Sequence, residues 1–284
     1  MSSQVTVVTV TYRQRWNLLR QTVSAAFEDG VGRAVVVDNE SLDDIASEME
    51  NMFPGRHRTI RLDVEFGSAG GYHEGVKAAV ADGAEFLLLL DDDNAVKKGT
   101  IASLLKTWES LRSRFPADRI CVSAVRQQGK AGLETAMNRK PLVPTSGFLK
   151  FNIANIPEKI LDKWIRKGKR TNGSFVVPTD PVPLSMAPWG GMFFHRSLLE
   201  RVGYPDPRFV LYCDDVEFSL RILSSGGTIW LDPNAEIQDL DLNWVNRPAR
   251  MLFLEPWISK GTDRHAYYMA RNHAYLESRY PRHP

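Results

Sequence analysis

The chain has 284 residues, of which 43% are apolar and 25% are charged, and its formal net charge is +2. A chain of this length and apolar content can bury a large core, which excludes an intrinsically disordered protein. The nearly balanced charge gives no reason to expect nucleic acid or an acidic polymer as a partner.

Two further features concern the cellular compartment. The two cysteines, Cys121 and Cys213, are far apart in the chain, which argues against a disulfide framework or a structural zinc site. The N-terminus lacks a basic segment followed by a long apolar stretch, and no run of about 18 apolar residues occurs. We therefore expect a cytoplasmic protein that does not span a membrane.

Short β-branched runs alternate with segments of helical character over about the first hundred residues. The pattern predicts strands at 4–12, 32–41, 58–66 and 84–94, with helices at 15–29, 41–53 and 67–83. Such alternation is typical of βαβ units and a parallel sheet. Ligands of open parallel sheets bind beyond the carboxyl ends of the strands. Here those ends carry Thr11 and Tyr12, Asp38 and Asn39, Gly67 to Gly71, and Asp91 to Asp93.

The fourth predicted strand runs from four leucines directly into Asp91, Asp92 and Asp93. A leucine run suits a strand that helices cover on both faces. The three carboxylates that follow repel one another, and burial adds a desolvation cost unless a cation compensates. Because strand side chains alternate, we expect Asp91 and Asp93 to converge on one hard divalent cation. A solvated acidic loop or a helix N-cap is the alternative interpretation.

The glycine-rich stretch 67–75 precedes a predicted helix. Gly67, Gly70 and Gly71 permit positive φ or a close backbone approach, and the start of a helix favours an anion. Its spacing is not G-x-G-x-x-G and it follows the third strand, so we reject a dinucleotide-binding site of the NAD type. A tight turn with a purely structural role remains the alternative.

A second acidic set lies in residues 188–226. An aromatic and glycine-rich segment leads through a predicted helix and a proline-bounded loop to Asp214, Asp215 and Glu217, which open another predicted helix. Acidic residues at a helix start also favour the positive end of the helix dipole, and this is the alternative to a catalytic role.

Together these segments resemble glycosyltransferase family 2, the nucleotide-sugar-dependent enzymes with a GT-A fold. Six motifs in order carry the resemblance, which covers nearly the whole chain: VTVTYRQRWNLL, VVVDNESLDD, EFGSAGGYHEGV, LLLLDDDN, WGGMFFHRSLLERVGYPDPRFVLYCDDVEFSLR and YYMARN. The resemblance implies an α/β fold of GT-A type, a Rossmann-like, mostly parallel sheet flanked by helices, with a C-terminal acceptor-binding part and a helical tail. It divides the chain into a nucleotide-sugar-binding half at 1–125, an irregular insert at 126–185, and an acceptor-binding and catalytic-base half at 186–284.

The resemblance also implies roles for individual residues in an inverting, metal-dependent sugar transfer. Asp91 and Asp93 would bind Mn²⁺ or Mg²⁺, and Asp215 would be the general base, with Asp214 as the fallback. The donor nucleotide would contact Thr11, Tyr12, Arg13, Asp38, Asn39, Gly70, Gly71 and Asp92. The acceptor would contact Trp189, Gly190, Gly191 and Glu217, although ordinary core packing is an equal expectation for Trp189.

One departure from the family concerns the metal. Many members carry a histidine ligand in the stretch that here is 228–244, and no histidine occurs there. Asp239, Asp241 or His265 could substitute, or the metal has two protein ligands, with diphosphate and water completing its shell.

The donor sugar is predicted from the resemblance of short segments to particular groups within the family. The triple aspartate and the glycine-rich turn look most like bacterial galactofuranosyltransferases, so we expect UDP-galactofuranose as donor and a growing surface polysaccharide or lipid-linked glycan as acceptor. The YYMARN and DDVEF segments are also typical of rhamnosyltransferases, which keeps a dTDP-rhamnose donor open. A non-catalytic sugar-nucleotide-binding protein of the same fold is a further alternative. So is a nucleotidyltransferase, although that class usually needs a glycine-rich loop after the first strand, which is missing here.

The spacing of apolar and basic residues in 156–170 predicts a basic amphipathic helix. Ile156, Ile160 and Trp164 recur at helical spacing. Residues 158–170 hold six basic and two acidic side chains, a local charge of +4. Such a helix can lie on the anionic inner face of the cytoplasmic membrane as a peripheral contact. A helix packed on the core with its charges in water is the alternative.

Overall fold

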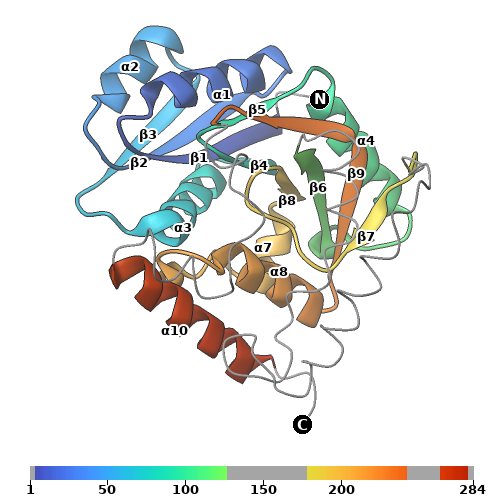
Figure 1. Cartoon of the computed structure of the whole chain (residues 1–284). Helices are drawn as coiled ribbons and strands as arrows, with labels where there is room; N and C mark the ends of the chain where they lie inside the picture. The colour runs from blue at the N-terminus through green and yellow to red at the C-terminus, as the bar shows by residue number, and fades with distance from the viewer. Residues whose placement is uncertain (1–3, 127–177, 242–262, 281–284) are drawn as a thin grey trace, which may run out of the picture.

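The structure is a computed structural model that describes residues 4–126, 178–241 and 263–280 (Figure 1). Within these residues, nine strands form one sheet in the order β3-β2-β1-β4-β8-β6-β9-β5, and β7 pairs with β9. The predicted helix at 156–170 lies outside the described residues. Among the described helices, none is both long and apolar enough to cross a lipid bilayer.

The first half of the chain contains the predicted βαβ units. Its elements are β1 (Val5–Arg13), α1 (Trp16–Glu28), β2 (Arg33–Ser41), α2 (Ile45–Met52), β3 (His57–Leu62), α3 (Gly67–Ala81) and β4 (Phe86–Asp91). β1 pairs in parallel with β2 and β4, and β2 pairs in parallel with β3. In this register Thr11 lies beside Asp38, and Val10 lies beside Asp91. The polar strand ends are therefore neighbours at one edge of the sheet, which confirms the predicted fold class.

The elements after β4 extend the same sheet, with β6 and β9 parallel to each other and β8 antiparallel. These elements are β5 (Asn94–Val96), α4 (Thr100–Arg112), η2 (Ala117–Arg119), β6 (Ile120–Arg126), β7 (Val182–Leu184), β8 (Met192–His195), α7 (Ser197–Val202), η4 (Pro207–Phe209), α8 (Asp214–Ser224), β9 (Thr228–Asp239) and α10 (Asp263–Arg279). β8 runs antiparallel to both of its neighbours, β4 and β6. The glycine- and aromatic-rich segment before β8 thus reaches the end of β4.

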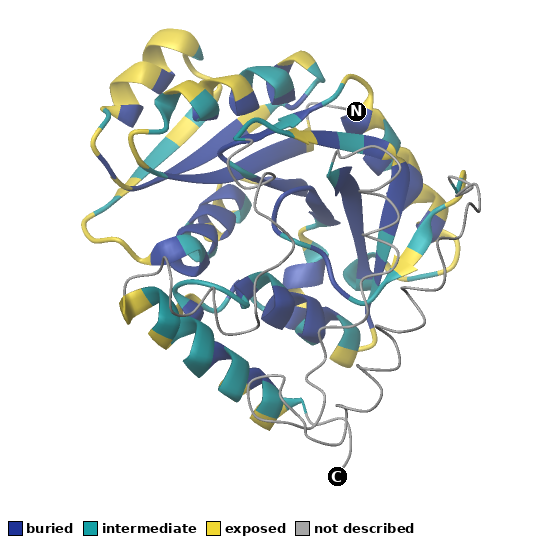
Figure 2. Cartoon of the chain, viewed as in Figure 1, coloured by how far each residue is buried: buried dark blue, intermediate teal, exposed yellow. Residues whose placement is uncertain are grey.

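Helices cover both faces of the sheet, and the leucine run of β4 shows why its residues are apolar. Leu88 and Leu90 belong to the core cluster on the side of α1, α2 and α4. Leu87 and Leu89 belong to the cluster on the side of α3, α7 and α8. The central strands are accordingly buried along their length, while exposed residues lie mainly on the outer helices and loops (Figure 2).

Three element ends differ from the predicted ones by three residues or more. The second helix begins at Ile45 because the Asp44 side chain accepts the Ser47 N–H as an N-cap. The third strand ends at Leu62, and the following loop is tied back by a bond from the Phe66 N–H to Asn39 Oδ1 of 2.9 Å. The fourth strand ends at Asp91, so Asp92 and Asp93 form a turn into β5 instead of continuing the strand alternation.

The C-terminal helix α10 packs beside α8, as the last helix in Figure 1 shows. Leu276 of α10 joins a small apolar cluster with Phe209, Val216 and Leu220. This cluster attaches the predicted helical tail to the segment that carries the second acidic set.

Candidate active site

A cavity of about 690 Å³ lies at the carboxyl ends of β1, β2 and β4, within the usual size range of ligand sites. Its wall carries acidic residues from separate parts of the chain, namely Glu65, Asp91, Asp92, Asp93, Asp214, Asp215 and Asp239. The two acidic sets, more than a hundred residues apart in the sequence, therefore face one space.

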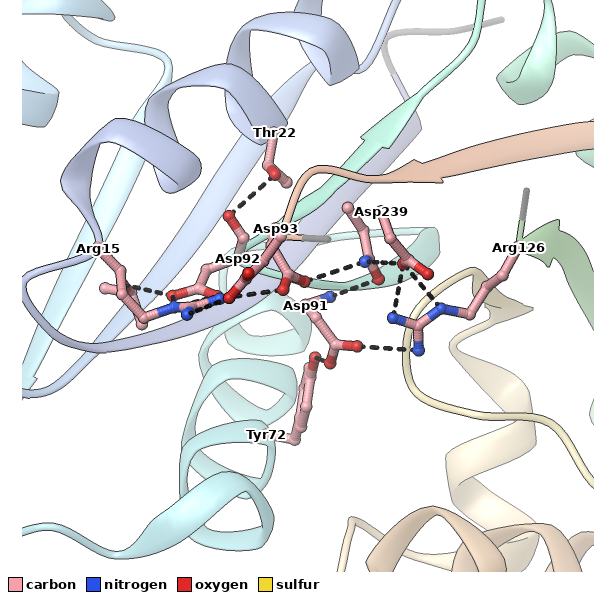
Figure 3. A network of polar contacts seen from close by, with 11 residues as sticks. Arg15, Thr22, Tyr72, Asp91, Asp92, Asp93, Arg126 and Asp239 are labelled. Atoms are coloured by element: carbon pink, nitrogen blue, oxygen red, sulfur yellow. Dashed lines mark hydrogen bonds and ion pairs between the residues drawn. The ribbon is translucent and has the colours of Figure 1, made fainter. Parts of the chain in front are cut away.

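Asp92 is held by groups from β1 and α1. Arg15 Nε lies 2.9 Å from both carboxylate oxygens of Asp92, and Thr11 Oγ1 donates to Oδ2 at 2.8 Å. Thr22 donates to the Asp92 backbone carbonyl at 3.0 Å. Figure 3 shows Arg15 beside Asp92 and Asp93. Arg15 thus neutralises part of the acidic triplet from within the protein.

Asp91 faces the opposite side of the cluster, toward a second arginine. Tyr72 Oη donates to its Oδ1 at 3.1 Å, and Arg126 Nη1 lies 3.2 Å from its Oδ2. Arg126 also donates to Asp239 Oδ1 through Nε at 3.0 Å and Nη2 at 2.7 Å. The guanidinium therefore bridges the ends of β4 and β9 (Figure 3).

Asn94 connects the two sides. Its side chain is fully buried, and its amide donates to Asp93 Oδ1 at 3.1 Å and to Asp239 Oδ1 at 2.9 Å. Asp93 also accepts from Arg15 Nη2 at 3.0 Å. Burial, together with the nearby charges of Asp91 and Asp92, raises the pKa of Asp93 to about 6.

The chemistry of this cluster fits a hard divalent cation. Its negatively charged groups are carboxylates, whose oxygens Mg²⁺ and Mn²⁺ prefer as ligands. The Asp91 side chain is 37% exposed and borders the cavity. The pKa of Asp93 is raised first by burial and then by the charges of Asp91 and Asp92, and a cation would offset both effects. Within the described residues, no three His, Cys, Asp or Glu side chains are grouped to hold an ion by themselves.

The candidate substitutes for the missing histidine lie near the same space. Asp239 and His265 border the cavity, and Asp241 Oδ2 lies 3.4 Å from Arg15 Nη1. The His265 ring lies 6.0 Å from the Tyr212 ring. Their roles toward a metal stay predictions.

The second acidic set begins α8. Asp214 Oδ2 accepts from Trp189 Nε1 and from Ser68 Oγ, both at 2.8 Å. Burial raises the pKa of Asp214, against the effect of these two hydrogen bonds. Asp215 is less buried, borders the cavity, and accepts the Val216 N–H through Oδ1 at 2.8 Å. Asp214 is thus fixed by neighbours, and Asp215 is the more accessible carboxylate.

The predicted acceptor residues take up different positions. Trp189 is 5% exposed, its ring packs against those of Tyr72 and Phe218, and the residue borders the cavity. Glu217 pairs with Arg221 at 2.7 Å and is not part of the cavity wall.

Gly190 lies against the acidic cluster, and Gly191 lies against Ala124 and Ile237. A Cβ at Gly190 would lie 3.1 Å from Asp91 Oδ2, and one at Gly191 would lie 3.0 Å from Ala124 Cβ. Whether any of the four predicted residues contacts an acceptor stays a prediction.

The predicted nucleotide residues divide into two groups. Tyr12, Asn39 and Asp92 border the cavity. The others lie outside its wall, namely Thr11, Arg13, Asp38, Gly70 and Gly71. Thr11 and Asp38 are buried, and Asp38 Oδ2 accepts from Arg61 at 2.6 Å.

The glycine-rich turn starts α3, as predicted, and its glycines serve close packing. A Cβ at Gly70 would lie 2.4 Å from Phe66 Cβ, and one at Gly71 would lie 2.4 Å from Val10 Cγ1. Gly67 has a φ of +69°, and a Cβ there would lie 2.0 Å from the Val210 carbonyl oxygen. This turn is therefore packed directly against the loop before α8, and a nucleotide contact of Gly70 and Gly71 stays a prediction.

Sequence reasoning missed five side chains that organise the site, namely Arg15, Ser68, Tyr72, Asn94 and Arg126. Arg126 ends β6 and could have been found by the strand-end rule that selected Asp38. Asn94 directly follows the aspartate triplet. The remaining three carry no local signal, because only the packing of α1 and α3 on the sheet brings them to the carboxylates.

Comparison with known proteins gives one family and several structural neighbours. The model of the family "Glycosyl transferase family 2" matches residues 6–172. No curated protein matches the chain at a significant level.

Among solved structures, GalNAc-T7 with UDP, GalNAc and Mn²⁺ is similar with a TM-score of 0.61 and 15% identity, over 96% of this chain and 48% of that one. Residues 1–349 of S. aureus TarS give a TM-score of 0.53 and 14% identity, over 98% and 72% of the two chains. The complex of the same TarS fragment with UDP-GlcNAc gives 0.55 and 12%, over 98% and 67%. The chain spans about half the length of the GalNAc-T7 chain, and at these identities the likeness shows a shared GT-A type fold.

Proposed function

The chain belongs to glycosyltransferase family 2, and from this premise we propose that it transfers galactofuranose from UDP-galactofuranose, with inversion and with a divalent metal, to a growing bacterial surface polysaccharide or lipid-linked glycan. The observation that carries the proposal is the cavity at the strand ends, where both acidic sets meet. The neighbours support a UDP-sugar donor and a metal, since GalNAc-T7 was solved with UDP and Mn²⁺ and TarS with UDP-GlcNAc.

Asp91 and Asp93 would hold Mn²⁺ or Mg²⁺, with Asp239, Asp241 or His265 as a further protein ligand or with diphosphate and water completing the shell. When bound, the ion supplies Lewis-acid neutralisation of the charge on the departing diphosphate. Arg15 already pairs with Asp92 and Asp93, and Arg126 with Asp91, so these two arginines offset part of the negative charge beside the ion.

Asp215 is proposed as the general base because it is the more accessible carboxylate at the start of α8. It would take the proton from the acceptor hydroxyl as that oxygen attacks the anomeric carbon, a role typically worth about 10²–10⁴-fold in rate. Attack from the face opposite the leaving diphosphate inverts the anomeric configuration. Asp214 would serve as an orienting neighbour, since Trp189 and Ser68 already occupy its Oδ2.

The first experiment tests metal use. We expect turnover with Mn²⁺, loss of turnover in EDTA, and near-complete loss in Asp91→Ala and Asp93→Ala with the fold retained. Asp82→Ala is the control, because Asp82 lies at the other end of α3, where it pairs with Arg58 and Arg33 outside the cavity wall, and it should keep its turnover. Full activity in EDTA would overturn the metal assignment.

The second experiment tests the donor. UDP-galactofuranose, UDP-galactopyranose and dTDP-rhamnose are compared by thermal shift, because a ligand that binds only the folded state raises the melting temperature. A shift with dTDP-rhamnose alone would favour the rhamnosyltransferase alternative, which the YYMARN and DDVEF segments support. Tight donor binding without turnover for any acceptor glycan would favour a non-catalytic sugar-nucleotide-binding protein.

A peripheral contact with the inner membrane surface remains part of the proposal and rests on the basic segment 156–170. Co-sedimentation should then require anionic liposomes and weaken with salt. Equal binding to neutral liposomes, or no binding to anionic ones, would refute this contact.

A further inference from the structure

The loop immediately before α8, residues 209–213, has an unusual backbone and is called the base loop below. Val210 has φ 60° and ψ −70°, and the Leu211 N–H donates at 2.7 Å to the carbonyl two residues earlier. This is the positive-φ γ-turn, a rare and strained conformation, here at a β-branched residue. Tyr212 and Cys213 follow with φ 66° and 64°. Such a run of backbone conformations persists only where neighbouring structure holds it.

Asn272 of α10 stabilises this backbone conformation through hydrogen bonds. Its Nδ2 lies 2.8 Å from each of the backbone carbonyl oxygens of Phe209, Leu211 and Tyr212, so its two N–H groups are shared among three acceptors. Its Oδ1 accepts from Arg271 Nε at 3.0 Å and Nη2 at 2.8 Å. The reverse orientation of the amide would set an oxygen against three carbonyl oxygens, so the hydrogen-bond partners fix the assignment. The Asn272 residue is 1% exposed, and its polar groups are therefore bonded within the protein.

The other side of the base loop rests on the glycine-rich turn. The Val210 carbonyl accepts the Ala69 N–H at 3.2 Å, and Gly67 lies against the same oxygen. Ser68 then donates to Asp214, the first residue of α8. The base loop is thus held between the start of α3 and α10. On α10 the buried Asn272 contacts three of its carbonyls, His273 Nε2 lies 3.6 Å from Cys213 Sγ, and the His265 ring lies 6.0 Å from the Tyr212 ring.

The base loop leads directly into the proposed catalytic carboxylates. Leu211, Tyr212 and Cys213 border the cavity together with Asp214 and Asp215. A change in the loop therefore changes where α8 begins and where both carboxylates point. Asn272 itself is not part of the cavity wall.

We propose that Asn272 is a positioning residue for the transfer reaction, which holds the base loop in its strained shape and so sets the direction of Asp215 without touching either substrate. The proposal rests on the proposed function for its catalytic meaning. This role would explain the last motif of the chain, YYMARN, because Arg271 and Asn272 are the final two residues of that motif. It also makes α10 part of the catalytic apparatus.

The test compares two variants of the same helix. Asn272→Ala removes the amide group that contacts the three base-loop carbonyls. Leu276→Ala, one turn further on, removes buried packing in the same interface and leaves those contacts in place. A misplaced catalytic group can cost about 10²-fold in rate, so we expect Asn272→Ala to lose about that much kcat with little change in donor KM. Leu276→Ala should lower the melting temperature and keep most of its kcat.

Hydrogen exchange of the amides in 209–217 provides a readout that does not depend on turnover. It should rise in Asn272→Ala well beyond the rise in Leu276→Ala. If Asn272→Ala does not fold, Asn272→Ser, which keeps one donor, takes its place in both measurements.

If Asn272→Ala and Leu276→Ala lost kcat equally, and in proportion to the fall in their melting temperatures, the positioning role would be refuted. A normal kcat in Asn272→Ala would also overturn it. If the wild-type protein transfers no sugar, the proposed function fails, and hydrogen exchange then tests by itself whether Asn272 holds the base loop. Unchanged exchange of the amides in 209–217 in Asn272→Ala would refute that structural role as well.

Discussion

Gly190→Ala is expected to disrupt the acidic cluster through one methyl group. A Cβ at Gly190 would lie 2.1 Å from Asn94 Oδ1, whereas ordinary contact starts at 3.4 Å, so the two atoms must separate by about 1.3 Å (3.4 − 2.1). Asn94 is fully buried and cannot withdraw without breaking its hydrogen bonds to Asp93 and Asp239. Interior packing gives little room for such a shift.

The expected cost follows from those two bonds. A hydrogen bond to a charged group contributes about 1.5–3 kcal/mol, so loss of both would lower the free energy of unfolding by about 3–6 kcal/mol. That is a large part of the total stability of about 5–15 kcal/mol typical of a domain. If the backbone moves instead, Trp189 moves with it and releases Asp214. We expect nucleotide-sugar binding to be lost in either case.

Urea unfolding and donor titration measure the two effects. Gly55→Ala is the control, because Gly55 has φ +69° but nothing within 4 Å of an added Cβ. It should cost only about 1–2 kcal/mol of backbone strain and leave donor binding intact. A Gly190→Ala protein as stable as Gly55→Ala, with normal donor affinity, would refute the reasoning.

Two further predictions concern charge. Asp215→Asn should keep donor binding and lose nearly all kcat, because an amide cannot accept the acceptor's proton, whereas Asp214→Asn should retain more; a dead Asp214→Asn beside an active Asp215→Asn would exchange the two roles. Burial lowers the pKa of His195 below its ordinary 6.5. The unfolded chain therefore binds more protons between the two values, and stability should rise with pH through that window up to about 6.5. His195→Gln should flatten this rise in melting curves, and parallel curves would refute it.

The fold and the two acidic sets could be predicted because their signals are local. The apolar runs of β1, β2 and β4 show strands buried on both faces, and the polar residues that end them mark the ligand edge of a parallel sheet. The convergence of Asp91 and Asp93 was argued from strand alternation, however, and the chain leaves the strand at Asp91. A turn that begins within three identical residues leaves no trace in hydrophobic periodicity.

The supports of the site could not be predicted in this way, because they depend on contacts across the whole chain. Ser68 and Asp214 are 146 residues apart, and Asn272 reaches Tyr212 from 60 residues away. In the sequence, Asn272 is one polar residue on a helix of mixed character, and its three carbonyl partners are backbone atoms that any residue would provide. A side chain that stabilises a strained backbone therefore cannot be identified from the pattern of residue types in the sequence. It becomes identifiable only when the φ angles of the base loop and the burial of its donor are known together.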